Sequence, residues 1–188
     1  MSLDTSTNLT GSKMLARIGI LVVSDRASRG VYEDKSGKAI SDFLEKVIRS
    51  NWIVIFKVVL DGAESVANAL IELSDREGCD LVLTTGGTGP APRDLTPEGT
   101  RLVISRELAG FGELMRRVSL DQVPTAILSR QIAGTRNHSL IVNLPGRPAA
   151  IDVCLKAVFP AIPYCLELIG ARPIEVNSDV CIAFRPGT

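Results

Sequence analysis

Short apolar runs alternate with amphipathic stretches along the first half of this chain. The runs cover 15–23, 52–60 and 80–84 and are rich in Leu, Ile and Val. Runs of this length that stop at small polar residues are typical of strands buried on both faces. The stretch 40–48 places its apolar residues on one face of a helix. Strand followed by helix, repeated, predicts a mainly parallel sheet with helices on both faces.

The remaining patterns complete a three-layer α/β/α architecture. The length of 188 residues fits one compact domain, because domains hold about 100–200 residues. We expect 1–13 to be a disordered tail and 14–188 to form this domain, with a long polar loop over 24–38. Further helices are predicted at 63–77, 96–107, 109–118 and 149–158, and further strands at 125–128 and 139–143.

Charge and cysteine content count against several classes of function. Lys plus Arg and Asp plus Glu each number 21, whereas a nucleic-acid-binding domain carries a basic excess. The apolar segments are short and interrupted by charge, which disfavours a membrane span. The four cysteines form no CxxC pair, so we interpret them as core residues and not as zinc ligands. With no secretory signal at the N-terminus, we expect a cytoplasmic protein.

Polar side chains follow the first three predicted strands at the point where each strand ends. Ser24 and Asp25 follow the first strand, Asp61 the second and Thr85 the third. In parallel sheets, ligands bind beyond the carboxyl ends of the strands. If these strands are neighbours, the four residues lie along one edge of the sheet and form a candidate binding site.

The segment 84–94, TTGGTGPAPRD, is the most informative part of the chain. Its glycines allow positive φ and close approach of a ligand, and successive backbone N–H groups in such a turn bind anions. Neither a dinucleotide fingerprint nor a Walker A lysine is present. A glycine-rich connection without a ligand is the alternative. The candidate phosphate-binding residues are Thr85, Gly86, Gly87, Thr88 and Gly89.

Two aspartates accompany this glycine loop. Asp94 closes the segment and Asp61 ends the preceding strand. A carboxylate beside a phosphate repels it unless a cation lies between them, and Mg²⁺ binds one or two carboxylates together with phosphate oxygens. The sequence therefore suggests a Mg²⁺ site at Asp61 and Asp94. The alternative for each is a helix cap or turn residue.

A second strand-to-helix turn, 143–148, contains Pro145 and Gly146. Its two prolines make it rigid, which suits the wall of a pocket. A plain tight turn is the alternative interpretation. Ser24 at the end of the first strand could donate a hydrogen bond to an anion.

Taken together, these motifs resemble one known family. The resemblance extends in order from about Leu15 to Pro186 and is to the MogA family of molybdenum-cofactor biosynthesis. The motifs that carry it are Val23-Ser24-Asp25-Arg26, Asp34-Lys35-Ser36-Gly37, Thr84-Thr85-Gly86-Gly87-Thr88-Gly89-Pro90, Arg93-Asp94-Leu95-Thr96-Pro97, Pro124-Thr125-Ala126-Ile127-Leu128-Ser129-Arg130 and Asn143-Leu144-Pro145-Gly146-Arg147-Pro148.

The resemblance implies Mg²⁺-dependent transfer of AMP from ATP to molybdopterin, with release of pyrophosphate. It assigns an essential role to Asp94 and a second functional role to Asp61. It also places the glycines, Ser24 and Asp25 in the pocket. It further implies a homotrimer and onward transfer of the product to a molybdate-inserting protein.

Two other functions fit the same pattern. One is a pterin-binding relative without catalytic activity, and the other is a trimeric scaffold. Turnover with molybdopterin and ATP separates them from the enzyme.

Overall fold

The computed structural model describes residues 15–25 and 35–187. The predicted disordered tail lies outside these residues, as does most of the long loop that follows the first strand. Within the described part, the chain forms an α/β fold built on one mixed sheet.

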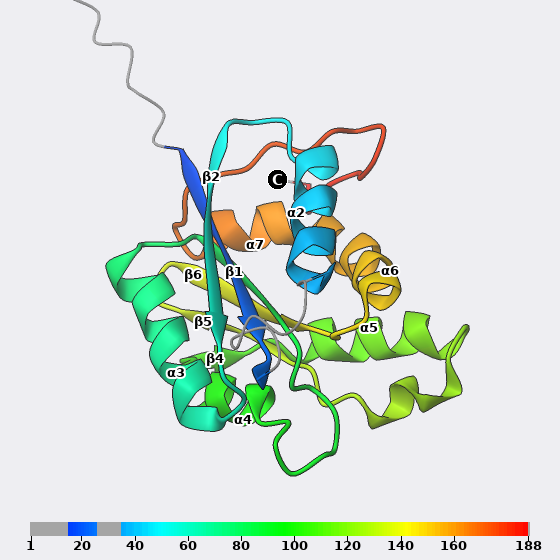
Figure 1. Ribbon diagram of the computed structural model, residues 1–188. Helices are drawn as coiled ribbons and strands as arrows, with labels where there is room; N and C mark the ends of the chain where they lie inside the picture. The colour runs from blue at the N-terminus through cyan, green and yellow to red at the C-terminus, as the bar shows by residue number, and fades with distance from the viewer. Residues whose placement is uncertain (1–14, 26–34, 188) are drawn as a thin grey trace, which may run out of the picture.

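Six strands form the sheet, in the order β2-β1-β3-β6-β5-β4 (Figure 1). The four strands from β2 to β6 are parallel, and β5 and β4 pair antiparallel at the far side. This arrangement confirms the prediction of a mostly parallel sheet. The strands are β1 (Ala16–Val23), β2 (Trp52–Val59), β3 (Leu81–Thr85), β4 (Arg106–Glu107), β5 (Ala133–Arg136) and β6 (Ser139–Leu144). The expectation that the run 52–60 is buried on both faces is wrong, because β2 lies at the edge of the sheet and none of its residues is buried.

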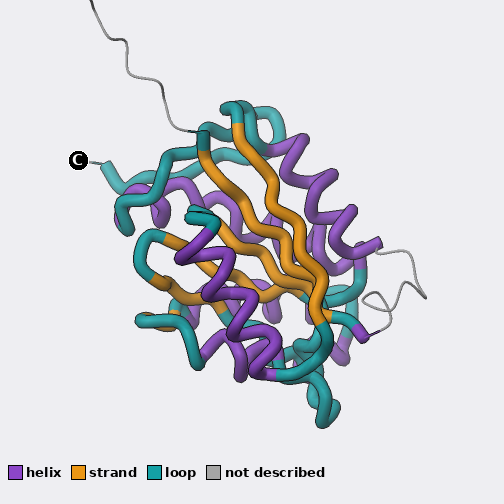
Figure 2. The backbone as a smooth tube through the Cα atoms, turned by 60° about the vertical axis from the view of Figure 1, so that its left-hand side comes forward, coloured by secondary structure: helices purple, strands orange, loops and turns teal. Residues whose placement is uncertain are grey.

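Helices cover both faces of the sheet (Figure 2). On β1, Ile18, Ile20 and Val22 pack into one core, whereas Leu21 and Val23 pack into the other. The first core is closed by α2 (Lys35–Val47), α5 (Ala109–Leu120), α6 (Pro148–Val158), η3 (Phe159–Ala161) and α7 (Ile162–Leu168). The second is closed by α3 (Ala63–Ile71) and η1 (Glu72–Arg76), with α4 (Thr96–Arg101) packed against α3.

At the edge formed by β4 and β5, the structure differs from the prediction in one helix and one strand. The predicted helix over 96–107 is wrong beyond Arg101, because the backbone N–H of Ser105 donates to the Thr135 carbonyl at 2.7 Å and the next two residues pair as β4. Their partner β5 was not predicted, since it is only four residues long and contains Gly and Thr. Edge pairing therefore overrides local helix propensity here.

The predicted strand at 125–128 is also wrong. Pro124–Leu128 forms a 3₁₀ turn, η2, with none of its residues buried. Its backbone bonds are local: Ala126 N donates to Val123 O at 2.9 Å, and Ser129 N donates to Ala126 O at 3.0 Å. An apolar run that finds no neighbouring strand satisfies its backbone in this way.

One segment has the length and composition of a membrane-crossing helix, Pro148–Leu168. In the fold it is divided among α6, η3 and α7. Some of its apolar side chains pack into the core, where Ile151, Phe159 and Leu166 are each 0% exposed, whereas Leu168 is 68% exposed. We therefore interpret it as a core element of the domain.

A buried carboxylate joins two segments of the chain at the end of the sheet where β1 and β3 begin. Asp80 is 4% exposed and precedes β3. It accepts hydrogen bonds from Arg17 N at 2.8 Å and from Arg172 N at 2.9 Å, and it pairs with the Arg172 guanidinium. These bonds tie the segment after α7 to the start of β1.

We predict that Asp80→Asn destabilises the protein by about 2–4 kcal/mol, because an amide group cannot accept all of these charge-assisted bonds. Urea unfolding would measure it. Asp42→Asn is the matched control, since Asp42 is exposed and pairs only with Lys38; its cost should stay below about 0.5 kcal/mol. Equal effects from the two variants would contradict the prediction.

Candidate active site

Three neighbouring strands end at the same level and bring their terminal residues together. Val23 on β1 is in register with Val59 on β2, and Val22 with Thr85 on β3. Asp25 follows β1 and Asp61 follows β2. The Asp25 backbone N–H faces Oδ2 of Asp61 at 3.4 Å, and the Asp61 N–H donates to Oδ1 of Asp25 at 3.1 Å.

The pKa of the Asp61 carboxyl is raised above its ordinary value of 3.8. Burial is the main cause, and the negative charges of Asp25 and Asp94 add to it; the Asp25 N–H and Arg93 oppose it. Asp61 and Asp94 are therefore within electrostatic range of one another. The negative charges of three nearby carboxylates repel one another, and a bound cation would offset this repulsion.

The glycine loop begins where β3 ends and presses against β1. Gly86 and Gly87 have φ of 95° and 62°, which L side chains rarely adopt. A Cβ on Gly86 would lie 2.3 Å from the carbonyl oxygen of Val23. The sequence prediction of glycines required by the backbone is therefore correct at both positions.

Thr96 holds this loop in shape. It is the first residue of α4, whose N-cap, Leu95, makes no capping side-chain bond. The Thr96 hydroxyl donates to the Gly86 carbonyl at 2.8 Å, and its N–H donates to the Gly87 carbonyl at 3.0 Å. The loop is thus bonded to the start of α4.

Asp94 folds back over the same loop. Its Oδ2 accepts from the Ala91 N–H at 3.2 Å. A Cβ on Gly89 would lie 2.7 Å from that oxygen, so the third loop glycine leaves room for this carboxylate. The neighbouring Thr88 is buried.

Arg130 is a site residue that the sequence did not single out. Its N–H donates to the Thr88 carbonyl and its Nε to the Gly89 carbonyl, each at 2.9 Å. Its two terminal nitrogens reach the Asp94 carbonyl and, as a fork, the Glu98 carboxylate. The guanidinium therefore spans the loop from Gly89 to Glu98, and the Arg130 backbone N–H adds the bond to Thr88. The only signal in the sequence was its place in a motif.

The turn after β6 packs on the glycine loop, as predicted for a pocket wall. The Thr85 hydroxyl donates to the Pro145 carbonyl at 2.9 Å. A Cβ on Gly146 would lie 3.5 Å from the Gly86 Cα. The Thr85 proton is engaged in this bond, so Thr85 holds the two turns together in this structure.

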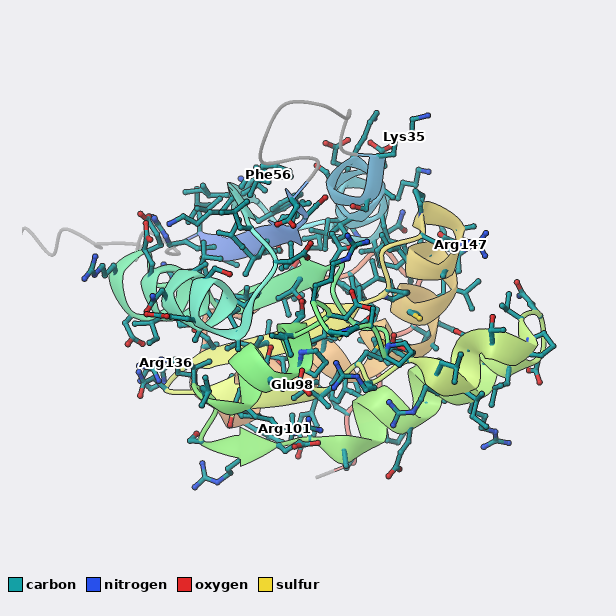
Figure 3. The ribbon with its side chains drawn as sticks, turned by 60° about the horizontal axis from the view of Figure 1, so that its bottom comes forward. Lys35, Phe56, Glu98, Arg101, Arg136 and Arg147 are labelled. Atoms are coloured by element: carbon teal, nitrogen blue, oxygen red, sulfur yellow. The ribbon has the colours of Figure 1, made fainter. Side chains whose placement is uncertain are left out.

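A cavity of about 550 Å³ opens beside Pro145, between α5, η2 and the start of α6. Polar side chains dominate one part of its wall, and they were not predicted as site residues: Arg116, Ser119, Gln122, Thr125, Ser129, Gln131 and Arg147. Neither predicted aspartate lines it. Figure 3 shows Arg147 at the start of α6 and Glu98 on α4.

All of the predicted site residues therefore lie at the carboxyl edge of the sheet or in the turns packed on it. Within residues 15–25 and 35–187, no three His, Cys, Asp or Glu side chains are grouped to hold a metal ion by themselves. Two carboxylates with room for phosphate oxygens suit a hard cation such as Mg²⁺, which keeps part of its coordination for substrate and water.

A glycine loop, two aspartates and an adjoining cavity lie at the carboxyl end of the parallel strands, where ligands bind in α/β folds of this kind. Comparison with known proteins gives a narrower class. Residues 19–164 match the family described as "Probable molybdopterin binding domain", and the chain belongs to this family.

Curated relatives cover nearly the whole chain. "Molybdopterin adenylyltransferase" of Helicobacter pylori J99 is 56% identical over 90% of this chain and 96% of its own length. The protein of the same name from Escherichia coli K12 is 43% identical over 90% and 93%. Among solved structures, the molybdopterin biosynthesis enzyme MoaB of Thermus thermophilus has a TM-score of 0.77 at 43% identity, covering 86% of this chain and 100% of its own.

We predict that Gly86→Ala disturbs the loop, because the added Cβ meets the Val23 carbonyl and the positive φ is strained. The expected cost is about 1–3 kcal/mol, with weaker binding of ATP. Thermal unfolding and calorimetric titration with ATP would measure both effects. Gly110→Ala is the control, since nothing lies within 4 Å of a Cβ there; a Gly86 variant as stable as this control would refute the strain argument.

We predict a pH-dependent contribution from the Glu98–Arg130 pair. Burial alone would raise the pKa of Glu98, but the Arg130 hydrogen bond and charge outweigh it and lower the pKa below 4.5. A lowered folded-state pKa stabilises the protein above pH 4.5, and this contribution disappears as the pH falls through the folded value.

The measurement is the difference in unfolding free energy between wild type and Glu98→Gln. Because the pair is partly exposed, the difference should not exceed about 1 kcal/mol at pH 7. It should vanish at acid pH, where Glu98 is protonated. A difference that persists unchanged in acid would assign the effect to packing instead.

Proposed function

We propose that this chain is a molybdopterin adenylyltransferase, which transfers AMP from ATP to molybdopterin and releases pyrophosphate. The observation that carries this conclusion is that the glycine loop, Asp61 and Asp94 lie together at one sheet edge, beside a cavity lined by both polar and apolar residues. Relatives that carry this name are 43–56% identical over about 90% of the chain.

The reaction asks for little covalent chemistry from the protein. An oxygen of the terminal phosphate of molybdopterin attacks the α-phosphorus of ATP. The bond from that phosphorus to the bridging oxygen of the β-phosphate breaks, and pyrophosphate leaves. Positioning of the two phosphates and stabilisation of their negative charge account for the rate. This agrees with a site that has no Ser–His or Cys–His pair among the described residues.

The glycine loop binds phosphate oxygens through backbone N–H groups. Its shape is already set by Thr96 and Arg130 before any ligand arrives, so little reorganisation is needed on binding. Ser24 and Asp25 border the loop from the end of β1, and Thr88 lies inside it. Pro145 and Gly146 form the wall between the loop and the cavity.

Asp61 and Asp94 would hold Mg²⁺. The raised pKa of Asp61, caused by burial and by two neighbouring carboxylates, fits a position completed by a cation. When bound, the ion neutralises charge on the phosphates and on the departing pyrophosphate. Arg93 supplies a further positive charge within electrostatic range of Asp61.

The cavity of about 550 Å³ takes the organic part of molybdopterin. A volume of this order suits a small organic ligand. Hydroxyl and amide groups on its wall can pair with the polar edge of a pterin ring. Its contact with the glycine loop through Pro145 places the ligand beside the phosphate site.

The alternatives keep the pocket but not the reaction. A pterin-binding relative without activity would bind molybdopterin and form no product. The other alternative is a trimeric scaffold; Dictyostelium discoideum "Gephyrin" is 36% identical over a region that makes up 27% of its length. Retention of both aspartates together with the preformed loop favours the enzyme.

The same proposal includes a cytoplasmic homotrimer that passes its product to a molybdate-inserting protein. Four free cysteines, three of them buried, agree with a reducing compartment. Exposed apolar side chains at Phe56, Ile127 and Phe184 offer surface for association.

We predict that Asp94→Asn and Asp61→Asn each lower the rate of adenylyl transfer by about 10²–10³-fold, because each removes a charge that holds the cation. Pyrophosphate release from wild type with molybdopterin, ATP and Mg²⁺ is the measurement. Asp179→Asn, an exposed change outside the site, should retain wild-type turnover. Wild-type binding of molybdopterin without product would leave the inactive relative as the function.

A further inference from the structure

The segment 129–131 separates the glycine loop from the cavity. Successive side chains of an extended segment point to opposite sides, and this is what the contacts show. Arg130 bonds to the loop side, whereas Ser129 and Gln131 line the cavity. The Ser129 hydroxyl donates to Oε1 of Gln131 at 2.7 Å. The cavity also adjoins the glycine loop beside Pro145, whose carbonyl accepts the Thr85 hydrogen bond, so a ligand in the cavity reaches the loop there.

Arg116 on α5 is fixed against this segment. Its Nη1 donates to the Gln131 carbonyl at 2.9 Å. The guanidinium crosses Gly112, where a Cβ would lie 3.1 Å from Nη1 and 3.3 Å from Nη2. A glycine one helical turn earlier thus lets the side chain lie flat along α5. The group is ordered before any ligand binds.

Arg116 differs from the other arginines near it in whether an acidic side chain pairs with its positive charge. Arg101 pairs with Glu107 at 3.2 Å, and Arg130 pairs with Glu98. Within the described part of the chain, Arg116 has no carboxylate partner, and its Nη1 donates to the neutral carbonyl of Gln131. A half-buried guanidinium without a counter-ion favours an anionic ligand.

The lining of the cavities beside Arg116 also bears on which ligand this residue would bind. Arg116 lines both the cavity of about 550 Å³ and a smaller one of about 320 Å³, whose wall also contains Arg101, Arg130 and Glu107. The described wall of the larger cavity contains two arginines, Arg116 and Arg147, and no Asp or Glu. In a chain of zero net charge, this is a local excess of positive charge.

We propose that Arg116 binds the phosphate group of the acceptor substrate and so determines affinity for that substrate and not for ATP. This inference rests on the proposed function, in which the acceptor is molybdopterin. The planar guanidinium fork suits phosphate. Its bond to Gln131, next to Arg130, places the acceptor phosphate on the side of the wall nearest the glycine loop.

The test compares Arg116→Gln with Arg117→Gln on the same helix. Arg117 is exposed and lines neither cavity. Binding of molybdopterin is followed by its pterin fluorescence without ATP, and turnover is measured separately. Arg116→Gln should weaken molybdopterin binding and raise its KM by about 10–100-fold. The KM for ATP should stay within about threefold, and Arg117→Gln should match wild type.

Two further measurements distinguish a loss of binding from a loss of structure. They are the molybdopterin affinity of Arg116→Lys and the thermal unfolding of each variant. Lysine keeps the charge but loses the fork, so its molybdopterin affinity should fall between wild type and the Gln variant. Equal losses for molybdopterin and ATP, or Gln and Lys variants that bind molybdopterin like Arg117→Gln, would overturn the inference. Wild-type binding with no product, together with weak binding by Arg116→Gln, would refute the proposed function and leave the anion site standing. No wild-type binding would refute both.

Discussion

Parallel pairing of β1 with both β2 and β3 is the constraint on which the rest of the site depends. In register, these strands end at one level, so the residues after them meet although they are up to 60 positions apart in the chain. The reciprocal bonds between Asp25 and Asp61 follow directly. A shift of one residue in the pairing would turn the side chains of a strand to the opposite face of the sheet. They would then no longer pack into the two cores described above.

The glycine loop is held in shape from three sides. The Val23 carbonyl limits it from one side, Thr96 bonds it to α4, and Arg130 spans it from Thr88 to Glu98. Under the proposed function, such preorganisation lowers the cost of stabilising charge during phosphoryl chemistry. Near the loop, burial and the charges of Asp25 and Asp94 raise the pKa of Asp61, which agrees with the proposed cation site.

Much of the fold was readable from local pattern, and the failures share one cause. The buried strands and the helices α2, α3, α5 and α6 have strong periodicity and were predicted. The end of α4, the short β5 and the turn η2 were not, because each is decided by whether a neighbouring strand is present to pair. Local sequence carries no information about that neighbour.

The same division holds for the site. The loop glycines could be predicted from the sequence, since positive φ favours glycine, and the two aspartates were proposed from their places after a strand and after the loop. The contacts of Arg130 and Arg116 and the cavity beside Pro145 were decided by the tertiary structure alone. Arg130 meets Gly89 across 41 positions and Arg116 meets Gln131 across 15. The position of an arginine in a sequence does not show which residues it will contact. Its partners, and any positive charge that no acidic side chain offsets, are determined only when the chain folds.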